Sequence, residues 1–321
     1  MHTVHVSMAS GGGYLGLYAS FWNQLESMPS GVRFRRSVTA YSGSSAGALA
    51  AASLSRGVPA KAMLNDISTG GLGRFKVLRA LAVFCRLKKS MYSGPYYYAR
   101  WARLCAQKAQ YNRVPVSIAV TNTQLAQRCL DYSVSSPTHN VVNAAVASAS
   151  IPYVLPAVAV PPEGLCVDGS VSRASFAEET VKHVINQAKG TLLLLNCIPW
   201  PGHSSGNGIT GFAKRLGNMY SSSLYDHGME NLLQEVHGFQ YQDGIFDTWI
   251  RNDNGILKVS DTGDLHIIFV APSSAQFERC GGRNGMANID YKASSSFIEK
   301  VKEQGKIMAN EFAVRYCSLA L

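Results

Sequence analysis

Short apolar runs alternate with longer amphipathic stretches along the chain. A short apolar run bounded by turn residues is typical of a buried strand, whereas apolar residues that recur every three or four positions are typical of a helix. Strands are predicted at residues 3–8, 38–41, 115–120, 128–133, 165–167, 191–197 and 265–270. Helices are predicted at residues 14–25, 45–54, 60–67, 74–89, 143–149, 216–237 and 289–314.

This alternation contains no internal repeat and no linker-like break. Strands that alternate with helices are typical of an α/β protein, in which each helix returns the chain so that the next strand runs parallel to the one before it. A chain of 321 residues can also bury a full core. We therefore expect one α/β domain over residues 1–321, built on a mainly parallel sheet.

Two glycine-rich loops stand near the start of the chain, each between a predicted strand and a predicted helix. In α/β proteins, loops at the carboxyl ends of strands border the crevice that holds the site. The loop at 43–47 has the Gly-x-Ser-x-Gly form of a sharp turn that exposes a serine hydroxyl, here that of Ser45. The loop at 10–16 offers consecutive backbone N–H groups with no side chains in the way, which suits an oxyanion hole.

Each loop alone is a weak signal, because glycine-rich loops also bind nucleotide phosphates. The stretch Gly11–Gly16 lacks the Lys-Ser/Thr ending of a P-loop, and no acidic residue near position 35 could hold a ribose. Two such loops at successive strand–helix junctions favour a nucleophilic serine beside an oxyanion hole.

A nucleophilic serine needs a general base. Asp168 ends the predicted strand at 165–167 and precedes a glycine, which places its carboxylate on the crevice side of the loops. A carboxylate hydrogen-bonded to a serine hydroxyl can act as the base in a dry site, although an Asp-Gly pair can also be a simple turn. Histidine, the usual base of α/β-hydrolases, follows no consistent motif at positions 139, 183, 203, 227, 237 and 266.

Taken together, these residues resemble the patatin-like phospholipase family. The matching pieces are Gly-Gly-Gly-x-x-Gly at 11–16, Gly-x-Ser-x-Gly at 43–47 and Asp-Gly-small at 168–170, in the family's order. The stretch Ala-Ser-Ala-Ser-Ile-Pro at 147–152 is similar to the segment before the family's catalytic aspartate. The resemblance implies a three-layer α/β/α sandwich with a mainly parallel central sheet.

The resemblance also implies the roles of individual residues. Ser45 would be the nucleophile of a serine acyl-ester hydrolase and Asp168 its base, and no metal or cofactor is required by this chemistry. The amides of three residues would form the oxyanion hole: Gly11, Gly12 and Gly13. Four further glycines would shape the loops: Gly16, Gly43, Gly47 and Gly169. Leu15 and Ser170 depart from the family's pattern, where a basic residue and Gly or Ala are usual.

The net charge of +10 is concentrated in one segment. Residues 67–130 hold eleven of the 30 basic residues and none of the 20 acidic ones. Such asymmetry indicates an anionic partner surface. No nucleic-acid-binding module is visible, so a phospholipid membrane is preferred over nucleic acid.

Residues 74–89 carry the pattern of a basic amphipathic helix. Four basic residues share one side of it: Lys76, Arg79, Arg86 and Lys89. A helix of this kind can lie in a membrane interface, and it can equally be a core helix with a solvated basic face. We expect residues 74–113 to form a membrane-facing or lid segment within the domain.

The seven cysteines are scattered and form no Cys-x-x-Cys pair, which is typical of reduced thiols. The chain shows no signal-peptide pattern and no run of about 18 apolar residues. We therefore expect a cytoplasmic protein that associates peripherally with membranes.

The predicted function is that of a lipid acyl hydrolase, of the phospholipase A type, that cleaves membrane glycerophospholipids through an acyl-enzyme. Two alternatives stay open: a catalytically weak lipid-binding protein on the same fold, and a neutral-lipid esterase. The sequence leaves open the acyl position, the head group and whether an activating protein partner is needed.

Overall fold

A computed structural model describes most of the chain. The described residues are 3–69, 90, 92, 94–152, 154–172, 176–187, 189–197, 256–262, 264–272 and 295–317. The helices expected at 74–89 and 216–237 lie outside this set.

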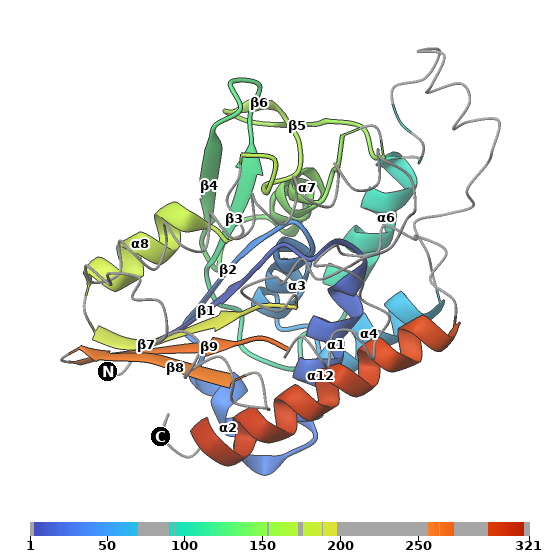
Figure 1. Ribbon diagram of the computed structural model, residues 1–321. Coiled ribbons are helices and arrows are strands. Elements are labelled where there is room, and N and C mark those ends of the chain that lie inside the picture. The colour runs from blue at the N-terminus through green and yellow to red at the C-terminus, as the bar shows by residue number, and fades with distance from the viewer. Residues whose placement is uncertain are drawn as a thin grey trace, which may run out of the picture.

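A seven-stranded sheet runs through the middle of the molecule (Figure 1). Its strands are β1 (Val4–Met8), β2 (Ala40–Ser44), β3 (Val116–Thr121), β4 (Gln127–Tyr132), β7 (Lys189–Leu195), β8 (Ile256–Thr262) and β9 (Asp264–Val270), in the order β4-β3-β2-β1-β7-β9-β8. The five central strands are parallel, and β4 and β8 each pair antiparallel at an edge. The sequence-based prediction of an α/β fold with a mainly parallel sheet is confirmed.

The strands β1, β3 and β7 are buried along almost all of their length, as expected for parallel strands covered on both faces. Their apolar runs made them visible in the sequence. The strand β2 is an exception, because it continues through the polar run Ser42, Gly43 and Ser44. The predicted strand ended before this run, at residue 41. The buried Ser42 hydroxyl is hydrogen-bonded to His5 and to Ser7 of β1, which makes a polar residue acceptable there.

Helices flank the sheet on both sides (Figure 1). On one side lie α1 (Leu15–Glu26), α2 (Pro29–Ser37), α3 (Ala46–Ser55), α4 (Ala60–Thr69), α6 (Gly94–Cys105), α7 (Thr138–Ser148) and α12 (Ser295–Tyr316). On the other side α8 (Glu178–Asn186) packs on β3, where the hydroxyl oxygens of Ser117 and Thr180 are 2.6 Å apart. The helix α2 was absent from the prediction because its nine residues show little apolar periodicity. No helix of the described residues is long and apolar enough to cross a membrane.

A separate two-stranded hairpin consists of β5 (Val158–Val160) and β6 (Gly164–Cys166). The strand predicted at 165–167 therefore belongs to this hairpin instead of the central sheet. The hairpin touches the sheet through an antiparallel bridge between Thr121 at the end of β3 and Val167. This bridge holds the residue that follows, Asp168, at the carboxyl end of β3.

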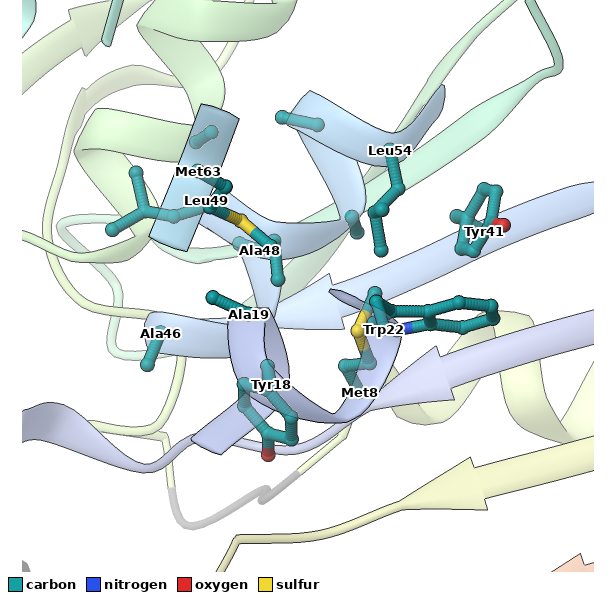
Figure 2. Close-up of a cluster of buried hydrophobic side chains, with 14 of the residues drawn as sticks. Met8, Tyr18, Ala19, Trp22, Tyr41, Ala46, Ala48, Leu49, Leu54 and Met63 are labelled. Atoms are coloured by element: carbon teal, nitrogen blue, oxygen red, sulfur yellow. The ribbon is translucent and has the colours of Figure 1, made fainter. Parts of the chain in front are cut away.

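The core is densest around α3, every residue of which is buried. Figure 2 shows Met8, Tyr18 and Trp22 packed beside the small side chains of this helix. Because half of the α3 residues are alanines, α1 and β1 can approach closely. A Cβ atom at Gly47 would lie only 2.2 Å from the carbonyl oxygen of Met8. The absence of a side chain at Gly47 therefore allows the first turn of α3 to lie against the end of β1.

Candidate active site

Ser45 sits at the junction between β2 and α3 with φ 52° and ψ −120°. A non-glycine residue in this region is strained, and such strain is typical of a nucleophile turn. The two flanking glycines have no space for a side chain: a Cβ at Gly43 would meet the carbonyl carbon and oxygen of Gly47 within 2.5 Å, and one at Gly47 would meet Met8. The turn therefore depends on both glycines of the Gly-x-Ser-x-Gly motif.

Ser45 and Asp168, which are 123 positions apart, meet in the fold: the Ser45 Oγ donates a hydrogen bond of 2.6 Å to the Asp168 Oδ2. The other carboxylate oxygen, Oδ1, accepts hydrogen bonds from the backbone N–H of Ser170 at 2.9 Å and from its hydroxyl at 2.6 Å. Ser45 is 4% exposed and Asp168 is 1% exposed. Hydrogen bonds thus orient the Ser45 and Asp168 side chains, and solvent is almost excluded from both.

Burial raises the pKa of Asp168 above its ordinary value, while the hydrogen bonds from Ser170 and Ser45 act in the opposite direction. Among the described residues, no cation stabilises this carboxylate electrostatically. A carboxylate with a raised pKa is a stronger base, which suits proton abstraction from a hydroxyl.

Gly169 is as tightly enclosed as the glycines of the serine turn. A Cβ atom there would lie 2.4 Å from the carbonyl oxygen of Ala119 and 2.7 Å from the Ser44 Oγ. Ser170, in contrast, contributes a hydroxyl that orients Asp168. The sequence indicated only that Ser170 departs from the family's usual Gly or Ala.

The first glycine loop leads from β1 into a short helix, η1 (Gly12–Tyr14), that contacts α3. Gly12 has φ 49°, a value that favours glycine, whereas Gly11 has the extended φ of −167° that any residue can adopt. A Cβ atom at Gly11 would lie 1.9 Å from the Cys197 Sγ. At Gly16 it would make only ordinary contacts, the nearest 3.4 Å from Val301. Of the four glycines expected to shape the loops, three are thus explained by close contacts, namely Gly43, Gly47 and Gly169, and Gly16 is not.

A buried histidine that the sequence analysis did not single out, His5, hydrogen-bonds to Ser42 at 2.9 Å. Burial lowers the pKa of His5 to about 4, and His183 on α8 acts in the same direction. Because alternate residues of a strand face opposite sides, Ser42 faces α8 while Tyr41 packs on Trp22 of α1. Within the described ranges no histidine hydrogen-bonds to Ser45 or Asp168.

The four predicted membrane contacts, Lys76, Arg79, Arg86 and Lys89, lie outside the described residues. Of the basic residues that follow them, Arg100 of α6 pairs with Asp66 at 2.6 Å. Lys108 and Arg113 flank a loop that hydrogen-bonds to Ser55 and Gly57, at the end of α3 opposite to Ser45. Arg128 of β4 pairs with Glu163 at 3.7 Å. Among the described basic residues of this segment, Arg100 and Arg128 are therefore in ion pairs, and Lys108 and Arg113 lie away from the site.

In the part of the chain that the structure describes, no group of three or more His, Cys, Asp or Glu residues could hold a metal ion.

Comparisons with known proteins give one family and several distant structural relatives. The family model for patatin-like phospholipase matches residues 6–181. No curated protein matches the chain. Among solved structures, VipD from Legionella pneumophila is similar at 13% identity with a TM-score of 0.39, over 97% of this chain and 67% of that one. Human GIVD cytosolic phospholipase A2 in complex with methyl gamma-linolenyl fluorophosphonate is similar at 10% identity with a TM-score of 0.49, over 99% of this chain and 59% of that one.

The type III effector protein ExoU is similar at 14% identity with a TM-score of 0.30, over 72% of this chain and 53% of that one. The chain thus spans about half to two thirds of the length of these solved chains. The family assignment rests on the family model, whose match covers more than half of the chain and includes both glycine loops and Asp168. The chain belongs to the patatin-like phospholipase family.

Proposed function

We propose that this chain is a phospholipase of the A type that hydrolyses acyl esters of membrane glycerophospholipids with a Ser45–Asp168 dyad. The observation that carries the proposal is the 2.6 Å hydrogen bond from the Ser45 Oγ to the Asp168 Oδ2 in a buried site. Membership of a family of lipid hydrolases gives the substrate class.

In the first step, the Ser45 Oγ attacks the ester carbonyl carbon and its proton passes to the Asp168 Oδ2. The hydrogen bonds from Ser170 keep the other carboxylate oxygen occupied, so that Oδ2 faces the serine. The amides of Gly11–Gly13 would stabilise the oxyanion of the tetrahedral intermediate. One such donor is typically worth about 3 kcal/mol in the transition state.

In the second step, the intermediate expels the lysophospholipid alkoxide, which takes the proton from Asp168 and leaves an acyl group on Ser45. Asp168, again ionised, then removes a proton from water as the water attacks the acyl-enzyme. The second tetrahedral intermediate then collapses: the bond between the acyl carbon and the Ser45 Oγ breaks, the Oγ takes the proton back from Asp168, and the fatty acid leaves. The reaction needs only the two side chains, the loop amides and water.

We further propose an anionic membrane as the surface on which the enzyme acts. The basic excess of residues 67–130 supports this, since cations near a membrane gain from its negative surface potential. Two leucines on hairpins beside the site support it as well: Leu125, 68% exposed, follows β3, and Leu165, 55% exposed, lies three residues before Asp168. The Thr121–Val167 bridge brings these hairpins together.

Fatty-acid release from phospholipid vesicles tests the proposal. The protein is incubated with phosphatidylcholine vesicles that contain or lack phosphatidylserine, and each incubation is repeated with added cell lysate. Ser45→Ala protein, prepared in the same way, is the control for contaminating esterases. We expect the wild type to release fatty acid and Ser45→Ala to release none, with faster release from the anionic vesicles. The identity of the released fatty acid shows which acyl position is cleaved. Activity only with lysate would indicate an activating partner.

Equal release by both proteins would contradict the role of Ser45. Vesicle binding without release under every condition would favour the lipid-binding alternative. Hydrolysis of triacylglycerol in preference to phospholipid would favour a neutral-lipid esterase.

The contact between Gly11 and Cys197 allows a test of the proposed oxyanion loop. Gly11→Ala should lower kcat by tenfold or more, because its methyl group would displace the loop from the Cys197 Sγ, 1.9 Å away. Cys197→Ala removes that sulfur and leaves a 3.6 Å contact with its Cβ, so the double variant should recover most of the activity. Cys197→Ala alone is the matched control and should remain active. A double variant as impaired as Gly11→Ala would show that this contact is not the cause.

A further inference from the structure

We propose that Ser148, the last residue of α7, is a positioning residue that holds Ser45 and the Asp168 loop in register. The inference rests on the proposed function of that pair. Ser148 does not touch the reacting atoms, and its own contacts are with the backbone on either side of them.

The Ser148 hydroxyl joins two of the elements that build the site. Its oxygen accepts a hydrogen bond of 2.8 Å from the backbone N–H of Ser45, and its own hydrogen is donated to the carbonyl oxygen of Ala119 in β3 at 2.5 Å. The side chain is fully buried, so water does not compete for either bond. One hydroxyl therefore fixes the serine turn relative to the strand beside it.

The backbone after Ser148 holds the other half of the pair. The carbonyl oxygen of Ser148 accepts a hydrogen bond of 3.0 Å from the N–H of Gly169, and that of Ser150 accepts one of 3.0 Å from the N–H of Asp168. The same short segment thus binds the backbone of Ser45 through a side chain and the backbone of Asp168 and Gly169 through carbonyl groups.

The conformation of Ser45 explains why this contact matters. With φ 52°, its backbone is in a region that non-glycine residues rarely adopt, and it persists only where the surroundings enforce it. Its N–H also belongs to the start of α3, where the helix itself supplies no acceptor. Without Ser148 this buried N–H would lose its partner, and the turn could relax in a way that moves the Oγ away from the Asp168 Oδ2.

Ser150 provides a matched control two residues away. Its hydroxyl is also buried, 1% exposed, but it donates to the carbonyl oxygen of Val146 in α7, at 2.7 Å. Alanine at position 150 keeps the backbone carbonyl that accepts from Asp168. Loss of either hydroxyl removes a buried hydrogen bond, and only one of the two bonds reaches the site. Ser148→Thr retains the hydroxyl and serves as the conservative variant.

The experiment compares Ser148→Ala, Ser148→Thr and Ser150→Ala with the wild type on a soluble short-chain ester. We expect Ser148→Ala to lower kcat by about 10–100-fold with KM within twofold of the wild type, because misplacement of reacting groups acts on the chemical step. Ser148→Thr should regain most of the activity, and Ser150→Ala should keep it. Melting temperatures measured in parallel separate loss of fold from loss of positioning.

A pH profile supplies a readout that a purely structural role would not change. The hydrogen bond from Ser45 lowers the pKa of Asp168, so a looser pair should move the acid limb of kcat/KM to higher pH in Ser148→Ala. The buried Tyr97 of α6, which interacts electrostatically with Asp168, has its pKa raised by burial and stays neutral over this range.

Equal losses of kcat in Ser148→Ala and Ser150→Ala, or an unmoved acid limb with no rescue by threonine, would overturn the proposal. If Ser45→Ala hydrolyses the ester as fast as the wild type, the proposed function fails instead, whatever the Ser148 variants do.

Discussion

Asp168→Asn should lower the rate of fatty-acid release by about 10⁴-fold, comparable to the effect of replacing the aspartate of a Ser-His-Asp triad. Asparagine has the shape of aspartate and can still accept the hydrogen bonds of Ser170 through its oxygen. It cannot accept the proton of Ser45, so attack on the ester would have to proceed without a base. Release from vesicles, measured against Ser45→Ala as the background, checks this expectation.

The same substitution should leave the melting temperature unchanged or raise it. Burial raises the pKa of Asp168 in the folded state above its value in the unfolded chain. A carboxyl group of this kind contributes stability that is fully present below the unfolded pKa and is lost as pH rises through the folded pKa. Asparagine does not ionise, so the variant loses no stability in this way. The melting temperature of the variant relative to that of the wild type should therefore be highest at pH 8 and lowest near pH 4.

Two results would contradict this account of Asp168. Turnover within tenfold of the wild type would show that another group acts as the base. A melting temperature that falls sharply at pH 8 but not at pH 4 would show that the ionised carboxylate stabilises the fold. The wild-type enzyme itself should lose activity as pH drops through the raised pKa, because the base must be ionised.

Arg35→Ala should reduce the free energy of unfolding by about 3–5 kcal/mol, the usual cost of removing one partner of a buried ion pair. The Arg35 Nε lies 3.4 Å from the Glu26 Oε1, and the two side chains are 2% and 9% exposed. The guanidinium also donates to the Tyr41 hydroxyl and, at 2.6 Å, to the carbonyl oxygen of Leu54, and it lies over the ring of Trp22. Alanine would leave the Glu26 carboxylate and the Tyr41 hydroxyl buried without the guanidinium.

Chemical denaturation with matched variants measures this effect. Arg128→Ala is the control, because Arg128 pairs with Glu163 at 3.7 Å while 45% exposed and should cost less than about 1 kcal/mol. Adding Glu26→Gln to Arg35→Ala should recover part of the loss, since it removes the stranded charge and keeps an acceptor for the N–H of Ala60.

The pH dependence of the Arg35→Ala loss has a definite sign. Burial already raises the pKa of Glu26, and removal of Arg35, which lowers it, would raise it further. Stability from a carboxyl group with a raised pKa is lost as pH rises through the folded pKa, so the variant should be most destabilised at high pH. A loss no larger than that of Arg128→Ala at every pH would show that the pair is not needed for the fold.

The sequence predicted the elements whose signals are local. The parallel strands β1, β3 and β7 are rich in apolar residues and are buried along almost all of their length. Elements with weaker local signals were missed or cut short: α2 begins with a proline and carries three arginines, and β2 continues through a polar Ser-Gly-Ser run. The closing helix α12 is confirmed from Ser295 onward, and residues 289–294 of the predicted helix lie outside the described residues.

By itself, the sequence determined the mainly parallel α/β fold and the turn that carries Ser45, because apolar strand runs are local patterns and the tight packing of Gly43 against Gly47 acts between near neighbours in the chain. Only the tertiary structure decided that the carboxylate of Asp168 meets Ser45, since an Asp-Gly pair by its pattern could have been a simple turn. It also revealed Ser148, whose contacts exist only where separate elements pack together. Such contacts depend on how the chain closes over more than a hundred residues, and a local pattern does not specify them.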